Sequence, residues 1–126
     1  MELETALKIM LDAQAKLRTP QGVNNQEFMS REMMRLAQAT GAVEEHLAQH
    51  EKEYEIRQAT LLGRFLVTEG TSATNAEKRT KIELGELKGN IAYLSRIVSS
   101  AWKQTSITQS RWNHLNTEYK LGGKVT

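Results

Sequence analysis

The chain has 126 residues, 25% charged and 39% apolar, a size and composition that exclude a disordered or a fibrous protein and suit one domain. It contains no cysteine, which excludes a disulfide framework and thiolate zinc sites. No apolar run approaches the ~20 residues that cross a bilayer, and the N-terminus lacks a signal-peptide pattern. We therefore expect a cytoplasmic protein without membrane association.

A single proline and sparse β-branched residues favour long helices, because proline removes a backbone donor and clashes with the preceding turn. No segment alternates apolar and polar residues at the period of a strand. The sequence thus predicts an all-α fold in one domain spanning residues 1–126.

The first predicted helix occupies residues 1–18. Its apolar positions fall on one stripe: Leu3, Leu7, Met10 and Leu17. Pro20 and Gly22 follow, and both break helices, so a loop is expected there.

The second predicted helix covers residues 26–69. Its apolar and half-polar positions recur at spacings of three and four: Met33, Leu36, Thr40, Val43, Leu47, His50 and Tyr54. The pattern then shifts to Leu61, Leu62, Phe65 and Leu66. A three-four repeat is typical of a coiled-coil seam that faces a partner helix.

The third predicted helix covers residues 74–120, starts at a capping box of Thr74 and Glu77, and stops at Gly122, leaving 121–126 as a tail. Its three-four seam is the longest in the sequence: Leu84, Leu87, Ile91, Leu94, Val98, Ala101, Thr105, Thr108, Trp112, Leu115 and Tyr119. We interpret Leu84, Leu87, Ile91, Leu94, Val98, Trp112 and Leu115 as packing or oligomer-contact residues. Two long helices joined by a short turn predict an antiparallel coiled-coil hairpin, and an incompletely covered seam predicts a homo-oligomer.

Charge is unevenly distributed along the chain. Residues 1–70 carry 8 Lys and Arg against 11 Asp and Glu, whereas residues 71–126 carry 9 against 4. Five cations recur every seven or eight residues on one broad face of the third helix: Lys81, Lys88, Arg96, Lys103 and Arg111. No acidic residue lies between Glu86 and Glu118 on this helix, so the face predicts a site for the phosphates of a nucleic acid. A merely solvated helix face is an equally weighted interpretation.

The other candidate residues favour ordinary roles. Trp102 and Trp112 could stack on bases, but packing is the favoured interpretation of both. His46 and His50 are four residues apart without a third ligand in the pattern, so we expect no metal. No phosphate loop, nucleophile elbow or carboxylate cluster is found, and we expect neither an enzyme nor a cofactor.

Four short stretches of the third helix carry a family resemblance: Glu77-Lys78-Arg79, Ala92-Tyr93-Leu94, Ser100-Ala101-Trp102-Lys103 and Gln109-Ser110-Arg111. Over roughly residues 50–115 the chain resembles the UvsY-like recombination mediators of bacteriophages. The resemblance implies a small helical oligomer that binds single-stranded DNA and helps a RecA-like recombinase displace a single-strand-binding protein, in the host cytoplasm. It also implies that Lys103 and Arg111 contact DNA.

Two other functions stay open from the sequence. A phage-encoded inhibitor could dock on a host or defence protein through the acidic run of the second helix, which contains Glu44, Glu45, Glu51, Glu53 and Glu55. A coiled-coil assembly or scaffold factor would oligomerise without affinity for DNA.

Overall fold

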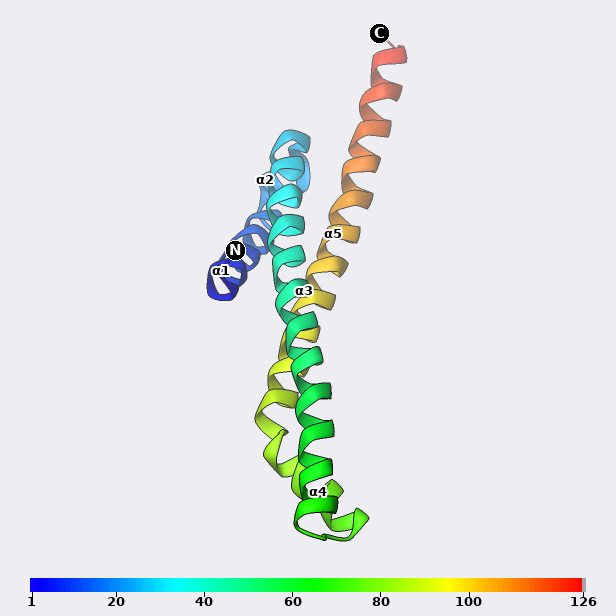
Figure 1. The fold of residues 1–126 in the computed structure, drawn as a ribbon. Helices are drawn as coiled ribbons and strands as arrows, with labels where there is room; N and C mark the ends of the chain where they lie inside the picture. The colour runs from blue at the N-terminus through cyan, green and yellow to red at the C-terminus, as the bar shows by residue number, and fades with distance from the viewer. Residues whose placement is uncertain (126) are drawn as a thin grey trace. The chain divides into compact units, whose positions relative to one another are not determined.

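A computed structural model describes the backbone of residues 1–125 and the side chains of residues 1–118. Within these residues every regular element is helical, which confirms the predicted all-α class (Figure 1). The elements in chain order are α1 (Leu3–Leu17), α2 (Pro20–Asn24), α3 (Gln26–Gly63), the π-helix η1 (Arg64–Thr68), α4 (Ala73–Glu83) and α5 (Gly85–Val125). None of the described helices combines the length and the apolar character that crossing a membrane requires.

The chain forms two compact units. The first unit joins residues 1–44 to the segment from Ile97 onward, and the second unit is Glu45–Arg96. Both unit boundaries fall inside long helices, α3 and α5, which continue across them. No Pro-rich or Gly-rich segment lies at either boundary, so the sequence contains no linker that would mark this division.

A tight turn connects α1 to α2. Thr19 caps α2 by accepting a hydrogen bond from the Gly22 backbone N–H at 3.2 Å, and Pro20 occupies the first turn, where no donor is needed. Gly22 lies directly against the end of α1, because a Cβ atom there would meet the Lys16 carbonyl oxygen at 2.3 Å. The predicted loop is therefore a short capped helix that only glycine allows.

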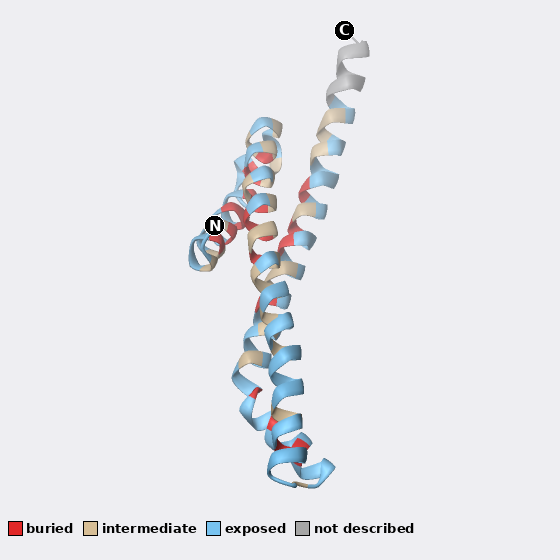
Figure 2. Cartoon of the chain, in the orientation of Figure 1, coloured by how far each residue is buried: buried red, intermediate tan, exposed pale blue. Residues whose placement is uncertain are grey.

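Buried apolar residues of the first unit come from α1, α3 and α5 (Figure 2). They are Ala6, Met10, Ala13, Leu17, Met29, Leu36, Ala39, Val43 and Ala101. An ion pair of 3.0 Å between Asp12 and Arg35 joins α1 to α3. Gln26 donates a hydrogen bond to the Trp112 carbonyl oxygen at 3.0 Å, which joins α3 to α5.

The second unit has a smaller core around Phe65 in η1. Phe65 is fully buried, and two guanidinium groups lie over its ring, Arg64 at 4.9 Å and Arg79 at 4.1 Å from the ring centroid. Arg79 also pairs with Glu69 at 3.0 Å. The π-helix widens the turn and changes the phase of the side chains, so Leu66, which the seam pattern placed inside, is 42% exposed.

Three boundaries of the predicted third helix are wrong. Ser72, not Thr74, caps its start by accepting a hydrogen bond from the Asn75 N–H. The helix is divided at Leu84, which leaves the helical conformation (φ −97°, ψ 5°) immediately before Gly85, a residue with low helix propensity. At the other end α5 continues through the predicted stop at Gly122 to Val125. Tyr119 as a seam position and Thr126 in the predicted tail lie outside the described side chains and backbone, respectively.

Candidate nucleic-acid interface

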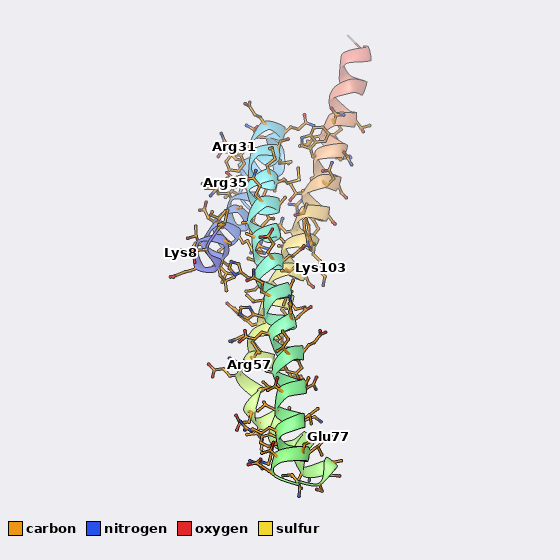
Figure 3. All side chains as sticks on the ribbon, in the orientation of Figure 1. Lys8, Arg31, Arg35, Arg57, Glu77 and Lys103 are labelled. Atoms are coloured by element: carbon orange, nitrogen blue, oxygen red, sulfur yellow. The ribbon has the colours of Figure 1, made fainter. Side chains whose placement is uncertain are left out.

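The five cations of the predicted phosphate-binding face are all exposed. Lys81 lies near the end of α4, and Lys88, Arg96, Lys103 and Arg111 lie on α5; Figure 3 labels Lys103. Lys81, Lys88 and Arg96 belong to the second unit, and Lys103 and Arg111 belong to the first. We name this set the basic stripe.

No member of the basic stripe forms an ion pair with any carboxylate among the described side chains. Four cations of α1 and α3 behave differently, whereas Lys52 of α3 is exposed and also has no ion-pair partner among the described side chains. Lys8 pairs with Glu4, Lys16 with Asp12, Arg35 with Asp12 and Glu32, and Arg57 with Glu53. The basic stripe is therefore available to an external anion.

Acidic residues from α3 lie beside one member of the stripe. Lys88 and Ile91 share a groove of about 390 Å³ with Glu51, Tyr54 and Glu55. The charge pattern of the third predicted helix does not reveal these carboxylates, because they belong to another helix. An antiparallel alignment of the two predicted seams, with Tyr54 opposite Ile91, would have revealed them. They lower the positive potential at Lys88, so the stripe is strongest where it lacks such neighbours.

Arg111 lies at a hollow of the first unit that the sequence did not indicate. The hollow measures about 430 Å³ and is formed by Val23 and Asn24 of the α1–α3 connection with Ser110, Arg111, His114, Leu115 and Glu118 of α5. Glu118 pairs with His114 at 3.1 Å. Arg111 thus keeps its charge free beside polar groups that can also contact a nucleotide.

The two tryptophans occupy different environments. Trp112 is half-buried, and its indole N–H is buried without a hydrogen-bond partner among the described residues. Trp102 is 41% exposed, and its indole N–H donates to the Glu44 carboxylate of α3. The environment of Trp112 agrees better with a packing role than the environment of Trp102 does.

The predicted packing residues lie along the covered side of α4 and α5. Leu84 and Leu94 are buried, and the others are half-buried: Leu87, Ile91, Val98, Trp112 and Leu115. Trp112 also lines a hollow of about 360 Å³ with Met33, Met34 and Ala37 of α3. Partial burial leaves apolar surface along these helices that a further chain could cover.

Gly85 and Gly89 fall on an open part of α5. A Cβ atom at either position would meet no other atom within 4 Å. The absence of side chains there leaves room for an approaching phosphate backbone rather than for a packed helix.

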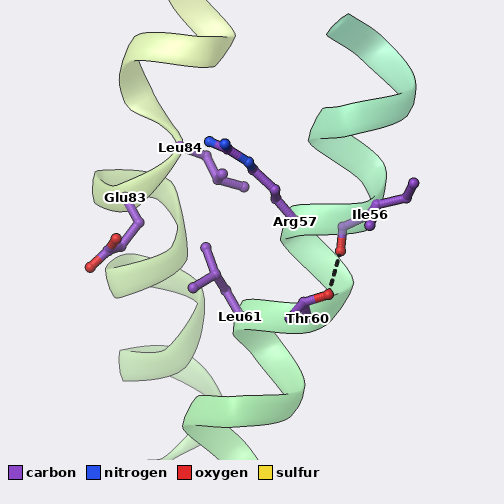
Figure 4. A pocket seen from close by; sticks show the side chains of 6 residues that line it. All are labelled: Ile56, Arg57, Thr60, Leu61, Glu83 and Leu84. Carbon is purple, nitrogen blue, oxygen red and sulfur yellow. Dashed lines mark hydrogen bonds between the residues drawn. The ribbon is translucent and has the colours of Figure 1, made fainter. Parts of the chain in front are cut away.

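Another hollow, in the second unit, measures about 270 Å³ (Figure 4). Its lining is Ile56, Arg57, Thr60, Leu61, Glu83 and Leu84. Arg57 is engaged by Glu53, and the Thr60 hydroxyl donates to the Ile56 carbonyl oxygen at 2.8 Å. The lining therefore brings together no set of free acid and base groups.

No metal-binding group of three His, Cys, Asp or Glu residues occurs in the described part of the chain. Nδ1 of His50 lies 2.8 Å from the His46 carbonyl oxygen, so this ring nitrogen is engaged with the backbone of its own helix.

Comparisons with protein families, with characterised proteins and with solved structures find no match to this chain.

Proposed function

We propose that the chain is a non-enzymatic, single-stranded-DNA-binding accessory protein of the recombination-mediator type, acting in the cytoplasm. Its basic stripe would hold the phosphate backbone, and a RecA-like recombinase and a single-strand-binding protein would be its partners, as the resemblance to UvsY-like mediators suggests. Four of the five cations lie on α5 and the fifth lies on α4.

The observation that carries the proposal is the exposed and unpaired state of the basic stripe. Lys and Arg that neutralise phosphates release condensed counterions, which supplies most of the sequence-independent affinity for nucleic acid. Cations already engaged by carboxylates contribute less, because binding must first break the ion pair. Arg96, Lys103 and Arg111 carry no such cost within the described structure.

We also infer an antiparallel coiled-coil hairpin of α3 and α5 that assembles into a homo-oligomer. The order of contacts in the first unit supports the antiparallel arrangement, since Gln26 contacts Trp112 whereas the later Glu44 contacts Trp102. The half-buried seam residues supply apolar surface for self-association. Repetition of the stripe around an oligomer would raise the effective concentration of cations along one DNA strand.

The test is fluorescence anisotropy of a labelled oligo(dT) titrated with the protein at about 50 mM and 200 mM salt. We expect binding at low salt that weakens steeply at high salt. Replacing Lys88, Arg96, Lys103 and Arg111 with glutamine should weaken binding and reduce its salt dependence. Unchanged affinity in this variant would show that the basic stripe is not the DNA-binding site. Absence of binding by the wild-type chain would contradict the DNA-binding function itself.

A second candidate function is supported by the acidic face of α3. Glu45, Glu51 and Glu55 are exposed, and none of them forms an ion pair with a described cation. Such a face suits an inhibitor that docks on a basic surface of a host or defence protein. A partner complex that survives nuclease treatment and is lost when these three residues become glutamine would favour it. Oligomerisation with neither activity would indicate an assembly factor.

A further inference from the structure

Trp102 of α5 contacts α3 in the first unit. Its indole N–H donates to the Glu44 carboxylate across the two helices. A hydrogen bond at the N–H edge restricts rotation of the ring, yet 41% of the residue stays accessible. The structure thus holds an aromatic ring in a defined orientation at the surface.

The neighbours of Trp102 leave its surroundings open. Ser99 and Ser106, one helical turn before and after it on α5, are exposed and small. Gly41, one turn before Glu44 on α3, has open space where a side chain would begin. The exposed fraction of Trp102 and these small or absent side chains leave part of the residue open to a ligand.

Charges of both signs lie beside Trp102: the cation of Lys103 is free, and the Glu44 carboxylate keeps its negative charge because its hydrogen-bond donor is a neutral indole. Lys103, the next residue, is exposed and unpaired among the described residues, and Arg111 lies about two and a half turns further along α5. Glu44, the nearest carboxylate to the ring, is engaged by the indole N–H. A ring beside a free cation is the combination that binds a base and its phosphate together.

We propose that Trp102 is the base-stacking residue of the DNA site, with Lys103 holding the adjacent phosphate. This inference rests on the proposed function and adds a preference for single strands, because bases in a duplex are already stacked on one another. The polar surroundings, Ser99, Ser106 and Gln109, favour a nucleic acid over a lipid surface, which needs contiguous apolar area.

Trp112 is the matched control within the same helix. Its ring lines the hollow with Met33 and Ala37, and its N–H is already buried, so it is less accessible to a base. Trp112→Phe keeps an aromatic ring in this hollow and removes the unpartnered N–H. The resulting protein has Trp102 as its single tryptophan.

The experiment measures both emission and affinity. The Trp112→Phe protein is titrated with oligo(dT) and with an abasic deoxyribose-phosphate oligomer of equal length, and the fluorescence of Trp102 is followed. We expect quenching by oligo(dT) and little quenching by the abasic oligomer. In anisotropy, Trp102→Leu should weaken oligo(dT) binding roughly 5- to 100-fold, as expected for one stacked base, and leave binding of the abasic oligomer unchanged.

Circular dichroism of Trp102→Leu verifies that helix content is retained. Equal loss of affinity for both oligomers, or unchanged affinity for oligo(dT) without quenching, would overturn the stacking role while DNA binding stands. A response of Trp102 to anionic phospholipid vesicles but not to oligo(dT) would also overturn it. Absence of all DNA binding in the wild-type chain would overturn both proposals.

Discussion

Apart from Lys52, which has no ion-pair partner, the cations of α1 and α3 differ from the described cations of α5 in what they contact. Lys8, Lys16, Arg35 and Arg57 all lie within ion-pair distance of a carboxylate. Lys88, Arg96, Lys103 and Arg111 have no such partner among the described side chains. The difference separates cations that have an ion-pair partner within the chain from cations that have none among the described side chains.

Local sequence accounts for most of this difference. Lys8, Lys16 and Arg57 each follow their acidic partner by four residues, the spacing that brings two side chains together on a helix. On α5 no acidic residue occurs between Glu86 and Glu118. Replacement of the free cations should therefore affect binding more than stability, and replacement of the paired ones the reverse.

Among the paired cations, Arg35 is expected to give the largest loss of stability when it is replaced. It contacts Glu32 at 2.6 Å and Asp12 at 3.0 Å, and the Glu32 side chain is only 3% exposed. Arg35→Met should lower the free energy of unfolding by about 3 kcal/mol, because the buried Glu32 carboxylate loses its close partner and keeps only Arg31 at 4.0 Å. Urea denaturation followed by circular dichroism measures this loss.

The double variant Glu32→Met with Arg35→Met provides the control for this experiment. It removes both charges, so we expect it to be more stable than Arg35→Met alone. A double variant that is as unstable as the single one would show that packing of the Arg35 side chain, and not its charge, stabilises this part of the first unit.

Two sets of three substitutions compare free with paired cations at equal change in net charge. Arg96, Lys103 and Arg111 to glutamine should weaken oligo(dT) binding by roughly tenfold or more and lower the salt slope, because phosphate contacts are lost. Lys8, Lys16 and Arg57 to glutamine should change affinity much less. Anisotropy titrations at several salt concentrations measure both sets, and equal losses would show that net charge alone governs binding.

Gln14 of α1 tests how a buried polar group without a partner affects stability. It is 8% exposed, and its Nε2 has no hydrogen-bond partner among the described residues. Gln14→Met should raise the free energy of unfolding by about 1 kcal/mol, because a buried donor without a partner is removed while the volume is kept. Loss of stability in urea denaturation would mean that the amide is satisfied in solution.

The smallest expected effect is a pH dependence at Asp12. Hydrogen bonds from Arg35 and then from Lys16 hold the pKa of Asp12 below its ordinary value of 3.8, and the same contact with Asp12 raises the pKa of Arg35. The stabilisation is therefore present above the ordinary pKa and is lost as the pH falls through it towards the lower folded-state pKa. Urea midpoints between neutral and acidic pH should fall less for Asp12→Asn than for the wild-type chain.

Two features of the fold were predictable because they depend on local pattern. One proline, sparse strand formers and long three-four repeats predicted helices throughout, and the structure is all-helical over the described residues. The start of α3 at Gln26 agrees with the predicted start at residue 26, since the turn chemistry before it is local.

Other boundaries depended on contacts that a pattern does not contain. The seam repeat passes through Leu84 without interruption, yet α4 ends immediately before this residue. Residues Arg64–Thr68 form a π-helix that contains the buried Phe65. The division into two units likewise follows from which residues gather around each core and not from any linker.

The sequence by itself determined the helical fold, the exposed basic stripe and the lack of acidic residues on the stripe's own helix, because spacing along one helix fixes which side chains share a face. Only the tertiary structure decided which charges acquire partners from another helix. It engages Arg35 with Asp12 of α1, places Glu51 and Glu55 in the groove of Lys88, and ties the Trp102 indole to Glu44 while much of the residue stays open. Such partnerships join residues far apart in the chain, and they form only when the helices pack.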